Sequence, residues 1–311
     1  MEQDNKHPLV AIKCLVFNHE PYLRECLDGF VMQQTDFPFV AIVHDDASTD
    51  HSADIIREYA ERYPDIICPI YETENQYSKG TLGRVMDAAI DATGAKYIAM
   101  CEGDDYWTDS HKLQKQVDFL ESHPDYSMCF HGADISIEGM DSKVKWAQCE
   151  NIEEKEYNST EMFVSWIVPT ASIVYNRKIY QTFQMVHREW LTRGDIAVVL
   201  TCAHVGKVWG MSQQMSVYRM QPHSVLHDPA IHSKEIYRLP KHFRCLYYNF
   251  PEVSKESITW CISNAYYGRM KAAHRNVFQR MMDFSCFVYW NPKFAMNKLK
   301  SLFDKRVLNS Q

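Results

Sequence analysis

Three carboxylates stand within four positions of one short segment: Glu102, Asp104 and Asp105. They follow the apolar run Tyr97–Met100, which has the length and composition of a buried strand. Crowded carboxylates raise one another's pKa and are stabilised by a cation. Mg²⁺ and Mn²⁺ prefer such oxygen ligands and often share them with substrate phosphates. The segment is equally typical of an acidic turn that caps the next helix, so its local pattern leaves both interpretations open.

A second acidic pair, Asp45 and Asp46, follows the apolar run Phe39–Val43. Both acidic clusters therefore come at the carboxyl ends of predicted strands. In parallel α/β sheets, ligands bind beyond that end of the strands. Random solvated turns would be distributed over both ends, so the shared placement favours a binding site.

Strand and helix patterns alternate over the first 135 residues. Apolar runs predict strands over residues 9–16, 39–43, 66–70 and 97–101, and helical spacing predicts helices over 20–33, 48–63, 82–92 and 112–122. Such alternation predicts an α/β fold whose mostly parallel sheet is covered on both faces. Further strands are expected at 127–131, 171–175 and 214–219, with a helix at 195–204.

The chain after about residue 230 reads as helical, with many basic and aromatic residues. We predict a main domain over 1–230. A helical region follows over 231–311. Its aromatic stripes are typical of packed helices, but segment 293–306 also resembles an amphipathic basic helix that could contact anionic lipid.

Composition excludes several other classes of protein. The chain has 311 residues and a net charge of -7, which argues against a nucleic-acid partner. It has no apolar run long enough to span a membrane, and its first residues do not resemble a signal peptide. Its ten cysteines are scattered without any C-x-x-C pair, which is typical of a reduced protein. We therefore expect a cytoplasmic protein, with peripheral contact at the inner face of the cell membrane through the C-terminal helices.

Five motifs in order make the chain resemble the inverting, GT-A-type glycosyltransferases of family 2, of the kind that build bacterial surface polysaccharides. The motifs are FNHEPYL at 17–23, DDASTD at 45–50, CEGDDYW at 101–107, GD at 194–195 and VYR at 217–219. Each motif alone would be weak, and the combination is specific. The resemblance covers roughly residues 8–225. It implies a nucleotide-binding part at about 8–125 and an acceptor part at about 126–230.

The resemblance implies a GT-A-like, Rossmann-type nucleotide-diphospho-sugar transferase fold with a C-terminal helical extension. It also implies a hexosyltransferase that uses a nucleotide-sugar donor, with UDP-sugars the commonest in the family, and a glycan or lipid-linked acceptor. The implied cofactor is Mg²⁺ or Mn²⁺, held by Asp104 and Asp105. Glu102 stands where the family usually has its first aspartate. The implied donor-binding residues are Phe17, Asn18, Glu20, Asp46, Ser48, Lys79, Glu102, Asp104 and Arg219.

Individual roles follow from the same resemblance. Asp46 would accept a hydrogen bond from the nucleotide base and Phe17 would stack on that base. Lys79 and Arg84 could neutralise the diphosphate, although both also fit ordinary solvated charges. Arg219, with His223, would close over the diphosphate.

Asp195 is the expected catalytic base, because inversion requires a carboxylate that deprotonates the acceptor hydroxyl. Its place before an apolar helix fits a simple N-cap as well. The family often has Glu-Asp here, whereas this chain has Gly194 before Asp195. Ala47 replaces the glycine that is usual in the second motif, so we expect the backbone there to avoid positive φ.

Two other functions fit part of the pattern. A nucleotidyltransferase also combines α/β architecture with acidic metal sites, but the Gly-rich basic loop typical of that class is absent after Leu15. A non-catalytic sugar-nucleotide-binding or scaffold protein would not need Asp104, Asp105 and Asp195 together. Neither a Gly-x-Gly-x-x-Gly fingerprint nor a P-loop is present.

Overall fold

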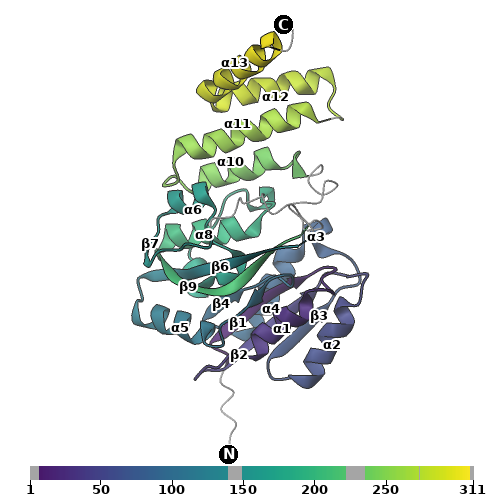
Figure 1. Cartoon of the computed structure of the whole chain (residues 1–311), viewed down its shortest axis with the longest axis vertical. Helices are drawn as coiled ribbons and strands as arrows, with labels where there is room; N and C mark the ends of the chain where they lie inside the picture. The colour runs from purple at the N-terminus through teal and green to yellow at the C-terminus, as the bar shows by residue number, and fades with distance from the viewer. Residues whose placement is uncertain (1–6, 139–148, 222–234, 273, 309–311) are drawn as a thin grey trace, which may run out of the picture. The chain divides into compact units, whose positions relative to one another are not determined.

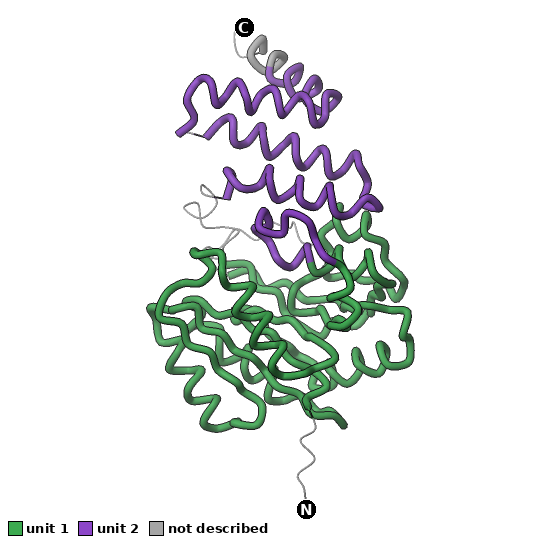
Figure 2. The backbone as a smooth tube through the Cα atoms, turned by 180° about the vertical axis from the view of Figure 1, so that it is seen from behind, with its two compact units in different colours: residues 1–183, 198–221 green, residues 184–197, 222–311 purple. Residues whose placement is uncertain are grey.

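The computed structural model describes residues 7–138, 149–221, 235–272 and 274–308. The chain divides into two compact units (Figure 2). The α/β unit contains residues 1–183 and 198–221, and the helical unit contains residues 184–197 and 222–311. Residues 184–197 thus group with the C-terminal helices, which the sequence did not indicate.

One nine-stranded sheet forms the centre of the α/β unit, with strand order β3-β2-β1-β4-β8-β6-β9-β5 and β7 beside β9 (Figure 1). The long pairs β1–β2, β2–β3, β1–β4 and β6–β9 are parallel, whereas the shorter pairs are antiparallel. The strands are β1 Val10–Val16, β2 Phe39–Asp45, β3 Ile67–Tyr71, β4 Tyr97–Met100, β5 Tyr106–Trp107, β6 Tyr126–Ile137, β7 Lys155–Glu156, β8 Val174–Asn176 and β9 Lys207–Met220.

Helices cover both faces of this sheet, as the apolar strands predicted. They are α1 Leu23–Val31, α2 Ser52–Arg62, α3 Gln76–Lys79, α4 Leu82–Thr93, α5 Lys112–Ser122, α6 Ser159–Ser165, α7 Arg177–Tyr180 and α8 Gly194–Val205, with a 3-10 turn at Thr170–Ser172. Side chains of α1, α2 and α5 belong to one core, and side chains of α4, α6 and α8 belong to the other. The boundary between the two units falls within α8.

Alternation along the strands assigns side chains to these two cores. In β4, Tyr97 and Ala99 belong to the first core, whereas Ile98 and Met100 belong to the second. This period of two is the side-chain geometry of a strand. Because both faces are buried, the sequence shows a continuous apolar run instead of a polar alternation.

The helical unit contains the 3-10 turn Arg188–Trp190 and the helices α10 Leu239–Asn249, α11 Lys255–Lys271, α12 Val277–Trp290 and α13 Pro292–Leu308 (Figure 1). A cluster of buried residues that includes Ile262, Tyr266, Phe287 and Ala295 joins α11, α12 and α13. The predicted C-terminal helical region is therefore confirmed.

Several local predictions needed correction. Segment 171–175 was expected to be a strand, but Thr170–Ser172 forms a 3-10 turn and β8 begins only at Val174. The strand expected at 214–219 is the second half of the longer β9, and α3, α6 and the short strands β5 and β7 were not predicted. All ten cysteines are free thiols, as their spacing indicated. Within the described residues, no helix has the length and apolar content needed to cross a membrane.

Candidate active site

The loops that follow β1 and β2 are held together by side-chain hydrogen bonds. Asn18 donates its backbone N–H to Ser48 Oγ at 2.9 Å and accepts the N–H of Thr49 on its side-chain oxygen at 2.7 Å. Glu20 donates its N–H to Asp50 and accepts the N–H of His51. Three predicted donor-binding residues, Asn18, Glu20 and Ser48, therefore also fix the shape of this edge of the sheet.

Ala47, in the second of these loops, corrects the sequence-based expectation. Its φ is +62°, in the left-handed region that favours glycine. The loop keeps the left-handed geometry without the residue best suited to it, which costs roughly 1 kcal/mol.

The acidic loop, residues Cys101–Asp105, is the continuation of β4 and lies beside the end of β1. Cys101 donates its N–H to Lys13 O at 3.1 Å and Gly103 donates its N–H to Leu15 O at 2.9 Å. A Cβ on Gly103 would stand 2.8 Å from His19 Nδ1 and 2.9 Å from Val16 Cγ2. Any larger residue at this position would force one of these side chains to shift, so packing favours glycine between Glu102 and Asp104.

The two aspartates of the acidic loop have different environments. Asp105 is buried, and its Oδ1 accepts the backbone N–H of Arg219 at 2.9 Å. Burial and then the neighbouring Asp104 raise the pKa of Asp105 well above its ordinary value. Asp104 is only partly buried; its Oδ2 accepts Gln221 Nε2 at 3.0 Å and lies 4.0 Å from His19 Nε2. Asp104 is therefore the better placed of the two to bind an external ion.

The side chain of Arg219 makes hydrogen bonds and ion pairs within the protein. Its guanidinium donates to Glu138 Oε1 at 3.2 Å, to Asp104 O at 2.9 Å and to Glu25. It also lies 4.5 Å from the ring centroid of Tyr106, and its side chain is 4% exposed. These bonds hold Arg219 against the acidic loop, and its direct contact with the diphosphate stays a prediction. His223, its predicted companion, lies outside the described residues.

Asp46 is buried at the end of β2 and binds the segment that precedes α4. Its carboxylate accepts the backbone N–H groups of Gln76 at 2.5 Å and Tyr77 at 3.0 Å. Each carboxylate oxygen retains acceptor capacity, so these bonds leave a contact to a base open. They also explain how a loop with few apolar residues holds its position next to the strand.

Four other predicted residues present their side chains at the surface. Phe17, directly after β1, is 45% exposed, which is unusual for a phenylalanine and suits stacking on a base. Lys79 is exposed and pairs with Glu74, and Arg84 is exposed on α4. Glu102 is exposed at the start of the acidic loop.

Asp195 belongs to the helical unit, at the start of α8. Burial raises the pKa of its carboxyl, the charge of Glu235 adds to this effect and the charge of Arg193 opposes it. Arg193 and Glu235 lie 3.5 Å apart and form an ion pair of the same unit. A carboxylate with a raised pKa is a stronger base than an ordinary aspartate, which fits the predicted role.

The carboxylates of the acidic loop fit a hard divalent cation whose remaining ligands come from the substrate. Among the described residues, no group of three His, Cys, Asp or Glu side chains is arranged to hold a metal by itself. Mg²⁺ is commonly bound through one or two carboxylates together with substrate phosphates. The partly exposed carboxylate of Asp104 and the exposed carboxylate of Glu102 match that mode of binding.

Sequence reasoning missed two neighbours of Asp104, namely His19 and Gln221. Gln221 follows Arg219 by two positions along the same extended segment, so the alternation of a strand could have placed both on one side. His19 had no distinguishing signal apart from its place in the first motif.

Comparison with known proteins identifies the family and agrees with the fold. The sequence profile described as Glycosyl transferase family 2 matches residues 14–183. This match spans more than half of the chain, which therefore belongs to glycosyl transferase family 2.

Relatives and solved structures extend this assignment. The uncharacterized protein Rv1520 of Mycobacterium tuberculosis is 34% identical over 227 residues, which cover 70% of this chain and 61% of that protein. TuaG of Bacillus subtilis, named as a candidate glycosyltransferase of teichuronic acid biosynthesis, is 24% identical over 83% of this chain and 94% of its own length. The matched region thus spans about three fifths of the mycobacterial relative.

Two solved structures share the fold at low sequence identity. S. aureus TarS 1-349 in complex with UDP has a TM-score of 0.59 and 13% identity, over 92% of this chain and 82% of that one. The mannosyltransferase PcManGT from Pyrobaculum calidifontis, in complex with GDP-Man and Mn²⁺, has a TM-score of 0.56 and 15% identity, over 96% and 88%. These likenesses confirm the predicted GT-A-type α/β fold.

Proposed function

We propose that the chain transfers one sugar from a nucleoside diphosphate donor, with uridine as the preferred nucleoside, to a hydroxyl of a glycan or lipid-linked acceptor. The reaction inverts the configuration at the transferred carbon and uses Mg²⁺ or Mn²⁺. The observation that carries the proposal is the difference between the two aspartates of the acidic loop. Asp105 is buried and bonded to the Arg219 amide, whereas Asp104 stays partly exposed.

Donor binding would use the edge of the sheet where the three loops meet. Phe17 offers an exposed ring for the base, and Asp46 offers a buried carboxylate beside it in the chain fold. Asn18, Glu20 and Ser48 keep the two loops in register through the bonds described above. Arg219 holds the acidic loop through the carbonyl of Asp104.

Asp104 would hold the divalent ion together with the donor diphosphate. Such an ion, when bound, stabilises the negative charge that develops on the leaving diphosphate. Asp195 would take the proton of the acceptor hydroxyl. The new bond forms between the acceptor oxygen and the sugar carbon while the bond from that carbon to the diphosphate oxygen breaks.

The proposed setting is the assembly of a surface polysaccharide. The name of TuaG, which aligns with most of this chain, supports this setting. UDP in the TarS structure and GDP-Man with Mn²⁺ in the PcManGT structure support a nucleotide-sugar donor and a divalent metal. The two structures hold different nucleosides, so a panel of donors is needed to test the proposed preference for uridine.

The test is a panel of nucleotide sugars whose effect on the melting temperature is measured with Mn²⁺ and with EDTA. A donor present at 100 times its Kd stabilises the folded state by about 2.7 kcal/mol. We expect the UDP-sugars to raise the melting temperature only with Mn²⁺, and Asp104→Asn to abolish the rise. Asp118→Asn, a change to an exposed acid of α5, is the matched control and should keep it. A panel without any metal-dependent shift would reject the proposal.

A pure binding module would also give this thermal shift. Slow hydrolysis of the donor by the native enzyme distinguishes the two functions, since a non-catalytic protein should release no sugar. Metal-dependent release that is lost in Asp195→Asn would support transfer.

A further inference from the structure

Helix α12 presents a wide apolar surface to solvent. Val277 is 76% exposed, Phe278 71%, Met281 64%, Met282 55% and Tyr289 78%. Large apolar side chains that are exposed together mark interaction surfaces much more often than isolated ones do. These residues, together with Phe284, form what we call the α12 face.

The α12 face is a single stripe of the helix. At 100° per residue its members fall within an arc of about 160°. The opposite side of α12 is buried, with Asp283 and Phe287 both fully inaccessible. A helix that is apolar on all sides is normally buried, so the exposed apolar side of α12 lacks a partner that would cover it.

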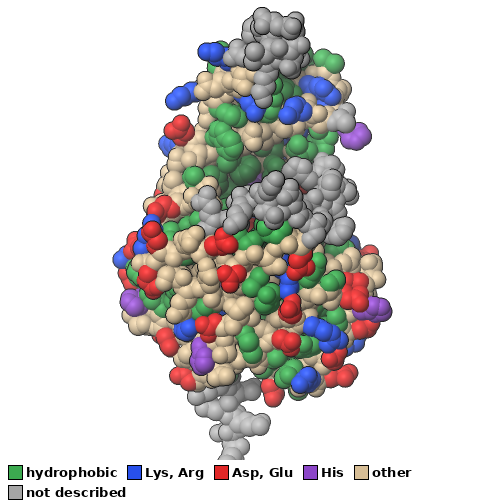
Figure 3. Space-filling model, viewed as in Figure 1, with side chains coloured by type: hydrophobic (Ala, Val, Ile, Leu, Met, Phe, Trp, Pro, Cys, Tyr) green, Lys and Arg blue, Asp and Glu red, His purple; other side chains and the backbone are tan. Residues whose placement is uncertain are grey.

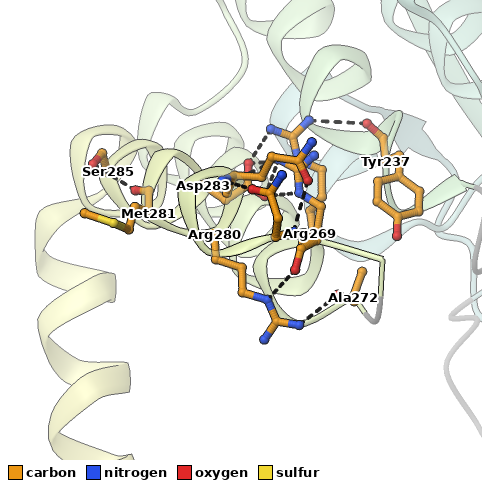
Figure 4. A network of polar contacts seen from close by, with 10 residues as sticks. Tyr237, Arg269, Ala272, Arg280, Met281, Asp283 and Ser285 are labelled. Carbon is orange, nitrogen blue, oxygen red and sulfur yellow. Dashed lines mark hydrogen bonds and ion pairs between the residues drawn. The ribbon is translucent and has the colours of Figure 1, made fainter.

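Polar bonds on the inner side fix which face points outward (Figure 4). Asp283 Oδ1 accepts Arg269 Nε of α11 at 3.0 Å, and its Oδ2 accepts Arg275 Nε at 2.9 Å. Ser263 Oγ of α11 donates to Phe287 O at 2.7 Å. The helix therefore cannot turn its apolar stripe inward without breaking a buried ion pair.

The one polar side chain within the stripe, Ser285, is exposed, and its hydroxyl is bonded to the helix backbone. Ser285 Oγ donates a hydrogen bond to Met281 O at 3.0 Å, one turn earlier in the helix (Figure 4). Arg280 borders the stripe, and its guanidinium donates to Arg275 O and Ala272 O. The surface thus presents methyl, thioether and aromatic groups with a cation at its edge.

The charge of this part of the chain is opposite to that of the rest. Residues 257–302 contain seven Lys and Arg residues and one acid, whereas the whole chain has a net charge of -7. That one acid, Asp283, is buried between two arginines. On the face drawn in Figure 3, Asp and Glu are spread over the α/β unit, while the C-terminal helices show mainly hydrophobic side chains, Lys and Arg.

We propose that the α12 face binds the surface of an anionic phospholipid bilayer, with its apolar side chains between the headgroups and its flanking cations on the lipid phosphates. Exposed Phe, Met, Val and Tyr beside Lys and Arg are the composition of helices that lie in the plane of a membrane interface. The sequence pointed to segment 293–306 for such contact, and the structure moves its centre to α12. This inference does not rest on the proposed sugar transfer.

A second copy of the chain is the competing occupant, and charge argues against it. Two copies would bring two cationic surfaces together, whereas an anionic bilayer complements them. Dimerisation through this face is therefore one of the outcomes that the experiment must separate.

The experiment is co-sedimentation of the full chain with vesicles of phosphatidylcholine, alone or mixed with phosphatidylglycerol. We expect binding to the mixed vesicles that exceeds binding to neutral vesicles by at least tenfold and weakens with salt. Each Lys or Arg near an anionic surface contributes roughly fivefold, so two such residues are enough for this difference. The double variant Phe278→Glu/Met282→Glu should lose this binding. The control variant Val164→Glu/Val186→Glu adds the same charge at two exposed residues outside α12 and should keep the lipid binding.

Melting curves and donor-induced stabilisation of each variant show whether it is folded, and Tyr289→Ser provides a milder change at the same face. Lipid binding that survives in both α12 variants would overturn the proposal. So would native protein that binds neutral and anionic vesicles equally, or a native dimer that the α12 variants dissociate while no lipid is bound.

Discussion

The acidic loop and the α12 face differ in how their side chains are held. In the acidic loop, backbone bonds to β1, a glycine with no room for a Cβ and a bond to the Arg219 amide specify each position. On α12, the outer side chains have solvent as their main neighbour. A site for small-molecule chemistry needs side chains fixed within a fraction of an ångström, whereas a lipid surface needs only area and charge.

The same contrast appears within the acidic loop itself. Asp105 is an internal part of the fold, and Asp104, its neighbour, keeps part of its carboxylate accessible. Two identical side chains therefore have different surroundings, and the proposal assigns them separate tasks on that basis. Variants of Asp104, Asp105 and Gly103 test whether the two carboxylates have different roles and whether the loop depends on close packing.

The largest expected effect comes from Asp104→Asn. Loss of the metal-binding charge should lower kcat/KM by about 10³-fold, in the range found when a charge-stabilising group is removed. The melting temperature without ligand should hardly change, because an amide oxygen can still accept from Gln221. Steady-state kinetics and thermal unfolding of the same preparation give both quantities.

Asp105→Ala provides the contrasting change. It leaves the Arg219 amide buried without an acceptor and should lower the free energy of unfolding by about 2 kcal/mol. Asp105→Asn keeps an acceptor oxygen and should recover most of that loss. Equal effects of the Asp104 and Asp105 changes on stability would contradict the assigned roles.

Asp195 should control the pH dependence of transfer. Its folded pKa is raised by burial, and the deprotonated form is the active base, so kcat/KM should fall as the pH decreases through that raised pKa. The acid limb should lie above the range of an ordinary aspartate. Asp195→Asn should lower kcat by about 10³-fold and leave the binding of UDP with Mn²⁺ intact. A retained acid limb in the residual activity of the variant would assign the base elsewhere.

Gly103→Ala tests the packing of the acidic loop. The added methyl group would meet His19 and Val16 at less than 3 Å, so we expect a loss of about 2 kcal/mol in unfolding free energy and weaker Mn²⁺-dependent nucleotide binding. Gly83→Ala is the matched control, since no atom lies within 4 Å of its added Cβ in helix α4. That change should stabilise the protein slightly, by up to about 1 kcal/mol. Thermal unfolding of the two variants gives the comparison.

Ala47→Gly should give the smallest effect. Glycine removes the cost of a positive φ at this position and should raise the free energy of unfolding by about 1 kcal/mol or less. Denaturant unfolding measures the change. A loss of stability would show that the methyl group of Ala47 contributes more by packing than its backbone conformation costs.

The fold and the acidic loop could be predicted well from the sequence. Apolar strands that end in Asp45-Asp46 and in Glu102–Asp105 indicated a parallel sheet with a site at its carboxyl edge, because burial on both faces leaves a clear pattern. The hydrogen bonds between the loops of Asn18 and Ser48 were not predictable, since they join residues 30 positions apart in the sequence. The same reason hid the engagement of Arg219 by Glu25 and Glu138.

The α12 face was only half visible in the sequence. Composition indicated basic, aromatic helices after about residue 230, and the sequence singled out segment 293–306 as amphipathic, not α12. Which side is buried depends on the Asp283 ion pairs with Arg269 and Arg275, which join residues of different helices and of the turn between them. Tertiary packing, not periodicity, decides the exposed side.

The most direct test of the central claim is Mn²⁺ binding measured by electron paramagnetic resonance, with and without UDP. If Asp104 and the donor diphosphate hold the ion together, the signal of free Mn²⁺ should decrease strongly only when protein and UDP are both present. It should return to the level of UDP alone in Asp104→Asn. Equal binding of Mn²⁺ by the native protein and by Asp104→Asn in the presence of UDP would contradict the claim.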